Sequence, residues 1–181
     1  MTLEAVSADN QPVEAPWDEY RARLVVFARM FGGPVARAPE DAAHEIIRKA
    51  MDRAETFDGV HSFATWLYRI ARNHCIDANR SGARRRAIMN LAGPELFEQA
   101  RRPAQPDAEL ERSETALAVA AAVDRLRPRD RRLVFLRFYE DLRLAEIAEI
   151  LGMPVGSVKY RLHVTMKRLR QSLGEYAEVA T

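Results

Sequence analysis

A single cysteine, Cys75, occurs among the 181 residues, so no internal disulfide framework can hold this chain together. Long apolar runs are also missing: none approaches the roughly 20 residues that a membrane span needs, which argues against membrane insertion. The first 20 residues carry five acids and no lysine or arginine, unlike the basic start of a signal peptide. Together these absences predict a cytoplasmic protein.

Strand-like alternation of apolar and polar residues is absent as well, and helical spacing recurs along the chain. Metal-ligand patterns are scarce, because His74 and Cys75 are adjacent and have no Cys-x-x-Cys or His-x-x-x-His partner. Neighbours on a helix point in different directions and do not share one ligand geometry. We therefore predict an all-α protein that is not an enzyme, with no catalytic residues, no metal and no cofactor.

The composition, 48% hydrophobic and 30% charged, is that of a soluble globular protein. The net charge of +2 conceals a strong asymmetry. Residues 69–86 hold one acid, Asp77, against the arginines Arg69, Arg72, Arg80, Arg84, Arg85 and Arg86. A second basic stretch occupies the expected C-terminal helix. Two separated basic surfaces suggest two contacts with one polyanion.

The N-terminal half is expected to form a bundle of three helices behind a tail. Residues 1–15 lack periodicity and are interpreted as a flexible acidic tail. Helical spacing predicts helices over residues 17–31, 40–57 and 62–81. Gly32-Gly33-Pro34 ends the first, a loop runs to Pro39, and Ser62 is the expected N-cap of the third, which ends near Ser81-Gly82. These helices define a first domain of residues 16–82.

Glycine and proline then interrupt any long helix over residues 83–112, which we interpret as a flexible linker between two helical domains. Short turns are expected at residues 88–91 and 96–100. Helical spacing resumes near Glu109, and Pro128 is expected in a short loop. The second domain is predicted to cover residues 113–175.

Two helices around one tight turn, between Leu142 and Leu173, are the main feature of the second domain. Glu146 and Glu149 of the first helix are expected to face water. The other face of that helix is apolar at positions i, i+3, i+4 and i+7, which are Leu144, Ile147, Ala148 and Leu151. Gly152 ends the helix and Pro154 starts the next, so the turn has the length found in a helix-turn-helix.

The second helix of this pair combines an apolar stripe with a basic face. The stripe consists of Val155, Val158, Leu162, Met166, Leu169 and Leu173. The basic residues are Lys159, Arg161, Lys167, Arg168 and Arg170. Small residues at the start, Gly156 and Ser157, would let the helix approach base edges closely. The pattern favours a helix that lies on DNA, and ordinary packing with a solvated basic face is the alternative.

Residues 43–80, AHEIIRKAMDRAETFDGVHSFATWLYRIARNHCIDANR, resemble region 2 of the extracytoplasmic-function group of bacterial RNA polymerase sigma factors. The resemblance lies in Phe57-Asp58-Gly59, in Ser62-Phe63-x-x-Trp66-Leu67-Tyr68-Arg69-Ile70-Ala71-Arg72-Asn73, and in Asp77. Residues 124–170 are similar to region 4 of the same group. Departures from the group's pattern are His44 in place of glutamine, Ile47 and Met51 in place of aromatics, and Tyr160, Val164 and Met166 in the second helix.

The resemblance implies a sigma factor that binds core RNA polymerase, directs it to specific promoters and promotes DNA opening for transcription initiation. It implies binding of the minus-thirty-five element in the major groove by Ser157, Lys159, Tyr160, Arg161 and Lys167. It implies trapping of the opened minus-ten strand by Asp58, His61, Ser62, Arg69, Arg72, Asn73 and Arg80. It implies binding of core polymerase by Asp41, His44, Glu45, Arg48 and Lys49, and an anti-sigma factor as a regulatory partner.

Several alternatives stay open at this point. Phe63 and Trp66 are expected in the core rather than as stacking platforms, and Arg69 and the polar face of the second helix could be solvated surface. The main rival function is a two-domain helix-turn-helix transcriptional regulator that acts without polymerase docking. A protein-interaction adaptor is a third class. By resemblance, the linker would thread toward the RNA exit path, with Asp107, Glu109 and Glu111 keeping it off the template.

Overall fold

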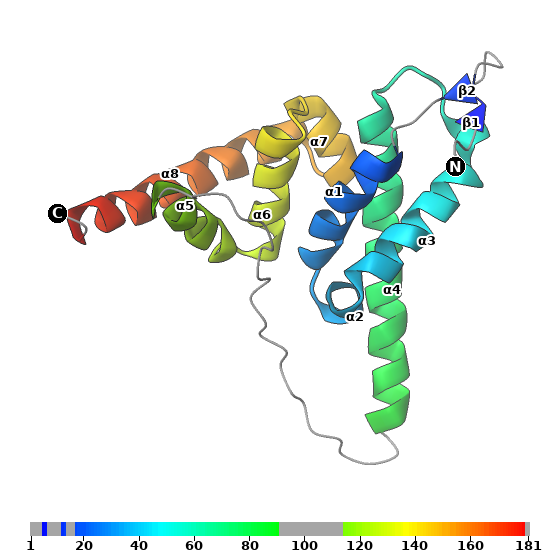
Figure 1. Ribbon diagram of the computed structural model, residues 1–181, viewed down its shortest axis with the longest axis horizontal. Helices are drawn as coiled ribbons and strands as arrows, with labels where there is room; N and C mark the ends of the chain where they lie inside the picture. Colours follow the sequence, from blue (N-terminus) through cyan, green and yellow to red (C-terminus); the bar gives the residue numbers. More distant parts are fainter. Residues whose placement is uncertain (1–4, 7–11, 14–16, 91–113, 180–181) are drawn as a thin grey trace.

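The structure is a computed structural model that describes residues 5–6, 12–13, 17–90 and 114–179, with side chains over 17–84 and 117–174. It is built of two helical lobes (Figure 1). The first lobe contains β1 (Ala5–Val6), β2 (Pro12–Val13), α1 (Trp17–Arg29), α2 (Gly33–Arg37), α3 (Pro39–Met51), the 3-10 turn η1 (Ala54–Thr56) and α4 (Phe63–Asn90). The second lobe contains α5 (Glu114–Asp124), α6 (Pro128–Val134), the π-helical turn η2 (Phe135–Tyr139), α7 (Leu144–Leu151) and α8 (Val155–Val179).

The first lobe is held together by apolar faces of α1, α3 and α4. Leu24 and Phe27 of α1, Ile46 of α3 and Leu67 and Tyr68 of α4 have no exposed surface. The burial of Leu24, Phe27, Ile46 and Leu67 follows from the apolar periodicity of the sequence, whereas the burial of Tyr68 was not predicted from it. Ser62 caps α4, because its Oγ accepts a hydrogen bond from the N–H of Thr65 at 3.2 Å. The three expected helices are therefore confirmed.

The structure differs from the expected bundle at two places in the chain. The predicted loop between residues 32 and 39 contains the short helix α2, which Pro34 can enter because its ring already has a helical φ. The helix expected to end near Gly82 continues to Asn90. Gly82 lies inside α4 because the helix passes close to α2: a Cβ at position 82 would lie 2.5 Å from Cγ of Pro34.

Two further differences are smaller. β1 and β2 form a two-residue antiparallel ladder, with Ala5 opposite Val13, although no strand was expected. α3 ends at Met51, so the apolar residue Phe57 is reached through η1 rather than on the same helix. The expected turn at residues 96–100 and the linker acids lie outside the described residues.

The second lobe contains the predicted helix-turn-helix, formed by α7 and α8. Gly152 has the left-handed φ of 62° that commonly ends a helix, and its N–H reaches back to the carbonyl of Glu149 at 3.2 Å. The carbonyl of Pro154 then accepts hydrogen bonds from the N–H groups of Ser157 and Val158 at 2.9 and 3.1 Å, and these bonds form the start of α8. Pro128 lies in the first turn of α6 rather than in a loop, again because its ring suits that position.

The two lobes are not separate in space: α7 packs along α4 (Figure 1). Phe135 of η2 lies 6.0 Å, between ring centroids, from both Phe27 and Tyr68 of the first lobe. A single cluster of buried apolar side chains therefore runs through both lobes. Among the described residues, no helix is long and apolar enough to cross a membrane.

Candidate nucleic-acid and polymerase interfaces

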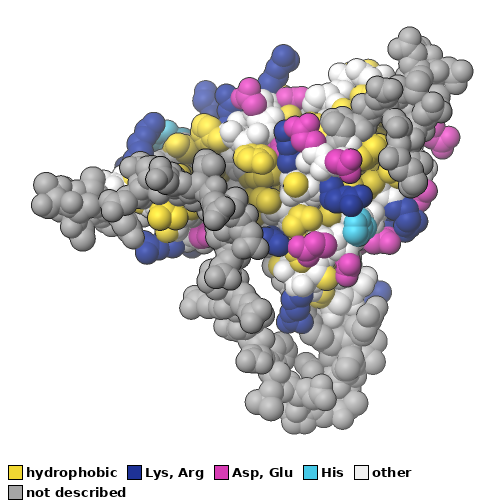
Figure 2. Space-filling model, in the orientation of Figure 1, with side chains coloured by type: hydrophobic (Ala, Val, Ile, Leu, Met, Phe, Trp, Pro, Cys, Tyr) yellow, Lys and Arg dark blue, Asp and Glu magenta, His cyan; other side chains and the backbone are white. Residues whose placement is uncertain are grey.

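α8 presents most of the predicted duplex-binding residues to solvent. Ser157, Lys159, Tyr160 and Lys167 are exposed, with 69% of Tyr160 accessible, and Arg161 is partly exposed. The opposite face of α8 is buried through Val158, Thr165 and Leu169, at 0%, 1% and 7% exposure. In the view of Figure 2, Lys and Arg side chains gather along the edge of the second lobe that α8 forms.

One residue that was expected in the buried apolar stripe of α8 is exposed instead. Val155 is 48% exposed, and the buried residue missed by the sequence pattern is Thr165. Val155 is the first residue of α8, where the helix has not yet reached the α5 and α6 surface that it covers later. A hydroxyl in the middle of a basic helix carries no apolar signal, so the periodicity could not indicate that Thr165 is buried.

Asp130 lies beneath the basic face of α8 and was not identified from the sequence. Its side chain is 8% exposed, and its two carboxylate oxygens lie 3.6 Å from Nη1 of Arg161 and 3.9 Å from Nη1 of Arg168. These contacts place one buried negative charge between two arginines of the candidate DNA-binding helix. The sequence signal was a single acid within the otherwise basic run Arg-Pro-Arg-Asp-Arg-Arg at residues 127–132.

The residues predicted to trap the opened strand lie at the start and along the length of α4. Asp58 accepts a hydrogen bond from the N–H of Val60 at 3.0 Å and so shapes the loop before the helix, in which Gly59 has a φ of 69°. Arg69 and Asn73 are exposed on successive turns. Arg80 is also exposed, but it lies 11 residues after Arg69 and is therefore about 16 Å further along the helix.

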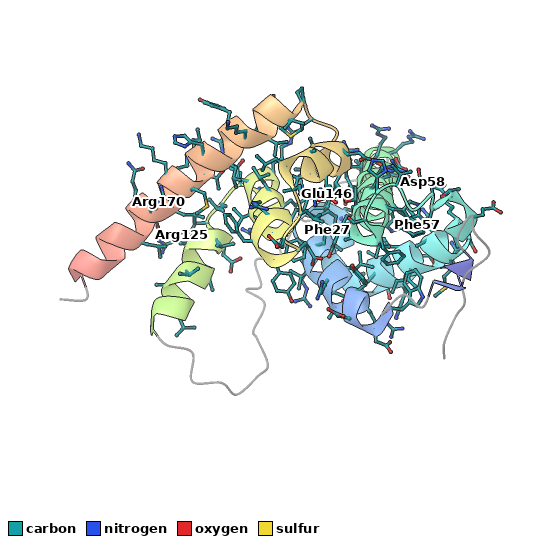
Figure 3. All side chains as sticks on the ribbon, turned by 90° about the horizontal axis from the view of Figure 1, so that it is seen from above. Phe27, Phe57, Asp58, Arg125, Glu146 and Arg170 are labelled. Atoms are coloured by element: carbon teal, nitrogen blue, oxygen red, sulfur yellow. The ribbon has the colours of Figure 1, made fainter. Side chains whose placement is uncertain are left out.

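His61, Ser62 and Arg69 converge on two carboxylates of α7. Glu149 accepts a hydrogen bond from Nη1 of Arg69 at 2.7 Å, and its other oxygen lies 3.0 Å from Nε2 of His61. Oε1 of Glu146 accepts from Oγ of Ser62 at 2.9 Å and from Oγ1 of the buried Thr65 at 3.0 Å. Figure 3 shows Glu146 at the junction of the two lobes. The structure thus gathers these three predicted residues and adds Thr65 to them.

The expectation that Glu146 and Glu149 face water is therefore wrong. Both point away from the apolar face of α7, as the periodicity requires, but the surface that they meet is α4 rather than solvent. Glu146 also accepts from the N–H of Arg143 at 2.8 Å. Burial, which raises the pKa of Glu146, is outweighed by its hydrogen bonds from Arg143, Ser62 and Thr65, so the pKa is lowered overall.

A second group of contacts joins the lobes on another side of the interface. The side chain of Glu140 is 1% exposed and accepts from Nη1 of Arg23 at 3.3 Å. Burial raises the pKa of Glu140, while Tyr68 and Arg23 act in the opposite direction. Arg132 donates to the carbonyl of Met30 at 2.9 Å and lies over the ring of Phe31 at 4.0 Å. Burial, assisted by the neighbouring Arg129, lowers the pKa of Arg132 to about 10.

The predicted polymerase-binding residues lie on the outer face of α3. Asp41, His44, Glu45 and Arg48 are exposed, and Lys49 is partly exposed. Arg48 bridges Glu45 at 2.8 Å and Asp52 at 3.2 Å, and its hydrogen bond lowers the pKa of Glu45. Lys49 contacts Nδ1 of His74 at 3.0 Å. Burial, followed by the charge of Lys49, lowers the pKa of His74.

The aromatic residues near the start of α4 pack inward. Trp66 is 4% exposed, and its Nε1 donates to Oγ1 of Thr56 at 3.2 Å. Phe63 is partly buried, with ring centroids 5.5 Å from Trp17 and 5.4 Å from Tyr20. The expectation that they belong to the core is confirmed. Cys75 is fully buried, which raises the pKa of its thiol to about 12. No cluster of potential metal ligands occurs among the described residues.

Comparisons with known families agree with this division into lobes. Residues 17–85 match the family model of sigma-70 region 2, and residues 116–169 match that of sigma-70 region 4. The first match covers α1, α2, α3 and most of α4, and the second covers most of the helices from α5 to α8. A region 2 bundle followed by a region 4 helix-turn-helix defines the protein class as a sigma factor.

Individual relatives narrow the class. The ECF RNA polymerase sigma factor SigL of Mycobacterium tuberculosis is 31% identical over 172 residues, covering 94% of each chain. SigW of Bacillus subtilis is 32% identical over 164 residues, covering 86% of each chain. RpoE of Cereibacter sphaeroides is 32% identical over 145 residues, covering 80% of this chain and 77% of its own. The chain belongs to the ECF group of RNA polymerase sigma factors, which direct RNA polymerase to specific promoters.

Two solved structures have a similar fold. The sigma factor RpoE of Bartonella quintana, in complex with the anti-sigma factor NepR, matches with a TM-score of 0.59 and 23% identity. That match covers 85% of this chain and 91% of the RpoE chain. CnrH, in complex with the cytosolic domain of CnrY, matches with a TM-score of 0.52 and 23% identity, covering 88% of each chain.

Proposed function

We propose that this sigma factor binds promoter DNA through a surface on α8 and a surface on α4, and core RNA polymerase through a surface on α3. The observation that carries the proposal is their chemistry. α8 presents exposed cationic and hydrogen-bonding side chains from one face, α4 presents cations beside a loop, and α3 presents mixed charges. Each surface suits a different ligand: duplex DNA, an opened strand and a protein.

The α8 surface is proposed to bind the minus-thirty-five element in the major groove. Lys159 and Arg161 can donate to guanine O6 and N7, while Ser157 and Tyr160 can donate to phosphates or bases. Lys167 lies six residues beyond Arg161, further along the helix, and is better placed for a phosphate. The buried carboxylate of Asp130 supports this division, because it lies against Arg161 and restricts the directions in which the guanidinium can point.

The α4 surface and the preceding loop are proposed to trap the minus-ten strand after the duplex opens. Arg69, Arg72 and Arg80 supply cations for phosphates, and Asn73 and His61 supply hydrogen bonds for unstacked bases. Asp58 acts indirectly, through its hydrogen bond to the loop N–H of Val60. Because Trp66 is buried, we assign hydrogen bonding rather than aromatic stacking to most of this surface.

The outer face of α3 is proposed to bind core RNA polymerase, and an anti-sigma factor is proposed as a regulatory partner. The solved relatives RpoE and CnrH are bound to NepR and CnrY, which supports a partner of this kind. We propose a binding role with no catalysis, carried out in the cytoplasm where polymerase and DNA are found. A regulator that never binds polymerase is not favoured, since both family regions are present.

The test is run-off transcription by core RNA polymerase, with and without this chain, on a promoter library. Initiation from a subset of promoters that requires the chain is the expected result. No added initiation from any promoter would refute the function. Permanganate reactivity of unpaired thymines on the selected promoters then measures opening separately from binding.

A further inference from the structure

Three of the side chains proposed to hold the opened DNA strand are already bonded to the second lobe in this structure. Arg69 and His61 contact the carboxylate of Glu149 at 2.7 and 3.0 Å, and Ser62 contacts the carboxylate of Glu146 at 2.9 Å. Arg72 is partly exposed and lies close to Gly152, in the turn after α7: a Cβ at that position would lie 3.1 Å from its Nη2. The contacts of Arg69, His61 and Ser62 all come from the second lobe.

We infer that the second lobe competes with the opened DNA strand for one anion site on the first lobe. The site consists of His61, Ser62, Thr65 and Arg69, and the proposal rests on the strand-binding role proposed for α4. In the closed arrangement of the lobes, the carboxylates of Glu146 and Glu149 occupy the positions that phosphate oxygens would take.

The donor set is suited to either anion. An arginine, an imidazole and two hydroxyls are donors that proteins use for carboxylate and for phosphate oxygens alike. Thr65 has no exposed surface, and its hydroxyl lies 3.0 Å from Glu146 and 2.8 Å from Ser62. The hydroxyls are therefore held in place, and a phosphate that entered would meet donors that need little rearrangement.

One set of donors cannot bind both anions at full strength. Arg69 donates to Glu149 at a normal hydrogen-bond distance, so a phosphate must displace that carboxylate before it can take its place. The apparent affinity for single-stranded DNA is then reduced by the fraction of molecules in which the lobes are apart. Strand capture and lobe closure are mutually exclusive states of the same surface.

The remaining contacts between the lobes hold the two carboxylates close to the anion site. Phe135 packs against Phe27 and Tyr68, and Arg132 reaches the carbonyl of Met30. These contacts do not use the anion site. They hold α7 beside α4, and Glu146 and Glu149 then lie within reach of the four donors at a high effective concentration.

The decisive variant is the double substitution Glu146→Gln and Glu149→Gln. Glutamine keeps the size of each side chain, and its carbonyl can still accept from the N–H of Arg143 and so preserve the start of α7. The matched control is Asp124→Asn with Asp141→Asn, which removes two negative charges from the same lobe. Their carboxylates pair with Arg131 and Arg137 of that lobe and are 74% and 94% exposed.

Binding is measured with the full chain by fluorescence anisotropy of a fluorescein-labelled, random-sequence 12-nucleotide single strand. We expect the glutamine variant to bind the strand about threefold to tenfold more tightly than the wild type. The reason is that it loses the two partly exposed ion pairs that Glu149 makes with Arg69 and His61. The asparagine control should change affinity less than twofold. Adding Arg69→Ala to the glutamine variant should remove the gain, because the site itself is then incomplete.

Equal affinities for the glutamine variant and the asparagine control would overturn the inference, as would a gain that survives Arg69→Ala. Run-off transcription with the same proteins separates this outcome from failure of the proposed function. If the chain supports promoter-specific initiation while the affinities stay equal, the competition is wrong and the sigma function stands. If no promoter responds, the proposed function fails whatever the affinities are. Circular dichroism of each variant verifies that it is folded.

Discussion

The DNA-facing surfaces of the two lobes are in opposite conditions. On α8, the candidate duplex-binding residues other than Arg161 are exposed, with Tyr160 at 69%. On α4, several strand-binding candidates are bonded to the other lobe. The surface that would meet closed duplex DNA is thus mostly free in this chain, whereas three side chains of the surface that would meet opened DNA are bonded to α7, although His61 and Arg69 keep 42% and 46% of their side-chain surface exposed. The comparison suggests that a contact needed only after melting is withheld until the lobes separate.

The largest expected effect comes from the apolar contact that joins the lobes. Phe135→Ala removes a ring that is 6% exposed and touches both Phe27 and Tyr68, so the free energy of unfolding should fall by about 3–5 kcal/mol. Phe138→Ala, at a neighbouring ring that is 58% exposed, is the control and should cost less than about 0.5 kcal/mol. Urea unfolding followed by circular dichroism measures both. Similar losses for the two variants would mean that the lobes are not joined through this ring.

The α4 surface is tested by replacing His61 and Asn73 with alanine. Binding to closed duplex promoter should be nearly unchanged, because the duplex contacts lie on α8. Opening should fail, since the bonds that offset a few kcal/mol of unpairing are lost. Permanganate reactivity on the selected promoter measures the defect, and a template already mismatched across the minus-ten element should restore much of it. Normal opening by the variant on the matched template would show that this surface is only a connector.

The open surface is tested by comparing two positions on α8. Arg161→Ala should change base preference in the minus-thirty-five element and cost about 1–3 kcal/mol on the preferred sequence. Lys167→Ala should weaken binding to all sequences alike and lower the salt slope by about 1. Selection from a randomised duplex library and titrations at several salt concentrations measure the two effects. An unchanged sequence profile for Arg161→Ala would argue against base contact.

A third surface, on α3, should be insensitive to lobe closure because it lies on the outer face of the bundle. The double substitution His44→Ala and Arg48→Ala should weaken binding to core polymerase about fivefold to tenfold. This is the loss expected when contacts of average energy are removed from a protein interface. Helical content should be unchanged, since both side chains are exposed. Fluorescence titration of core polymerase measures the affinity. Binding as tight as that of the wild type would remove these residues from the interface.

The smallest effect is a pH dependence within the first lobe. The pKa of His74 is lowered by burial and by Lys49, so the unfolded chain binds a proton there more readily than the folded chain does. The free energy of unfolding should therefore decrease as pH falls below about 6.5 toward the lowered pKa. His74→Gln should have a shallower decrease over the same range. Identical slopes for variant and wild type would show that this histidine does not contribute.

Much of the fold could be predicted because its signals are local. The apolar spacing of α1, α3 and α4, the cap at Ser62 and the turn at Gly152 each depend on residues within a turn or two of one another. The candidate site residues came instead from the resemblance to a family, and they stay predictions. Local patterns failed where a neighbour from elsewhere in the chain decides the outcome. The helix α4 continues through Gly82, where Pro34 of α2 packs too closely for a side chain. Thr65 and Thr165 are buried although neither is apolar.

The sequence by itself determined that this chain is helical, that it has two lobes and that it belongs with the sigma factors, because spacing and motif are properties of the chain alone. Only the tertiary structure decided where the acids of α7 point. Glu146 and Glu149 lie 81 and 80 residues from Thr65 and Arg69, and no periodicity extends over that separation. An exposed helix face and a face that meets another lobe have the same pattern in sequence, since both are polar. They differ only in what lies opposite, and packing determines that.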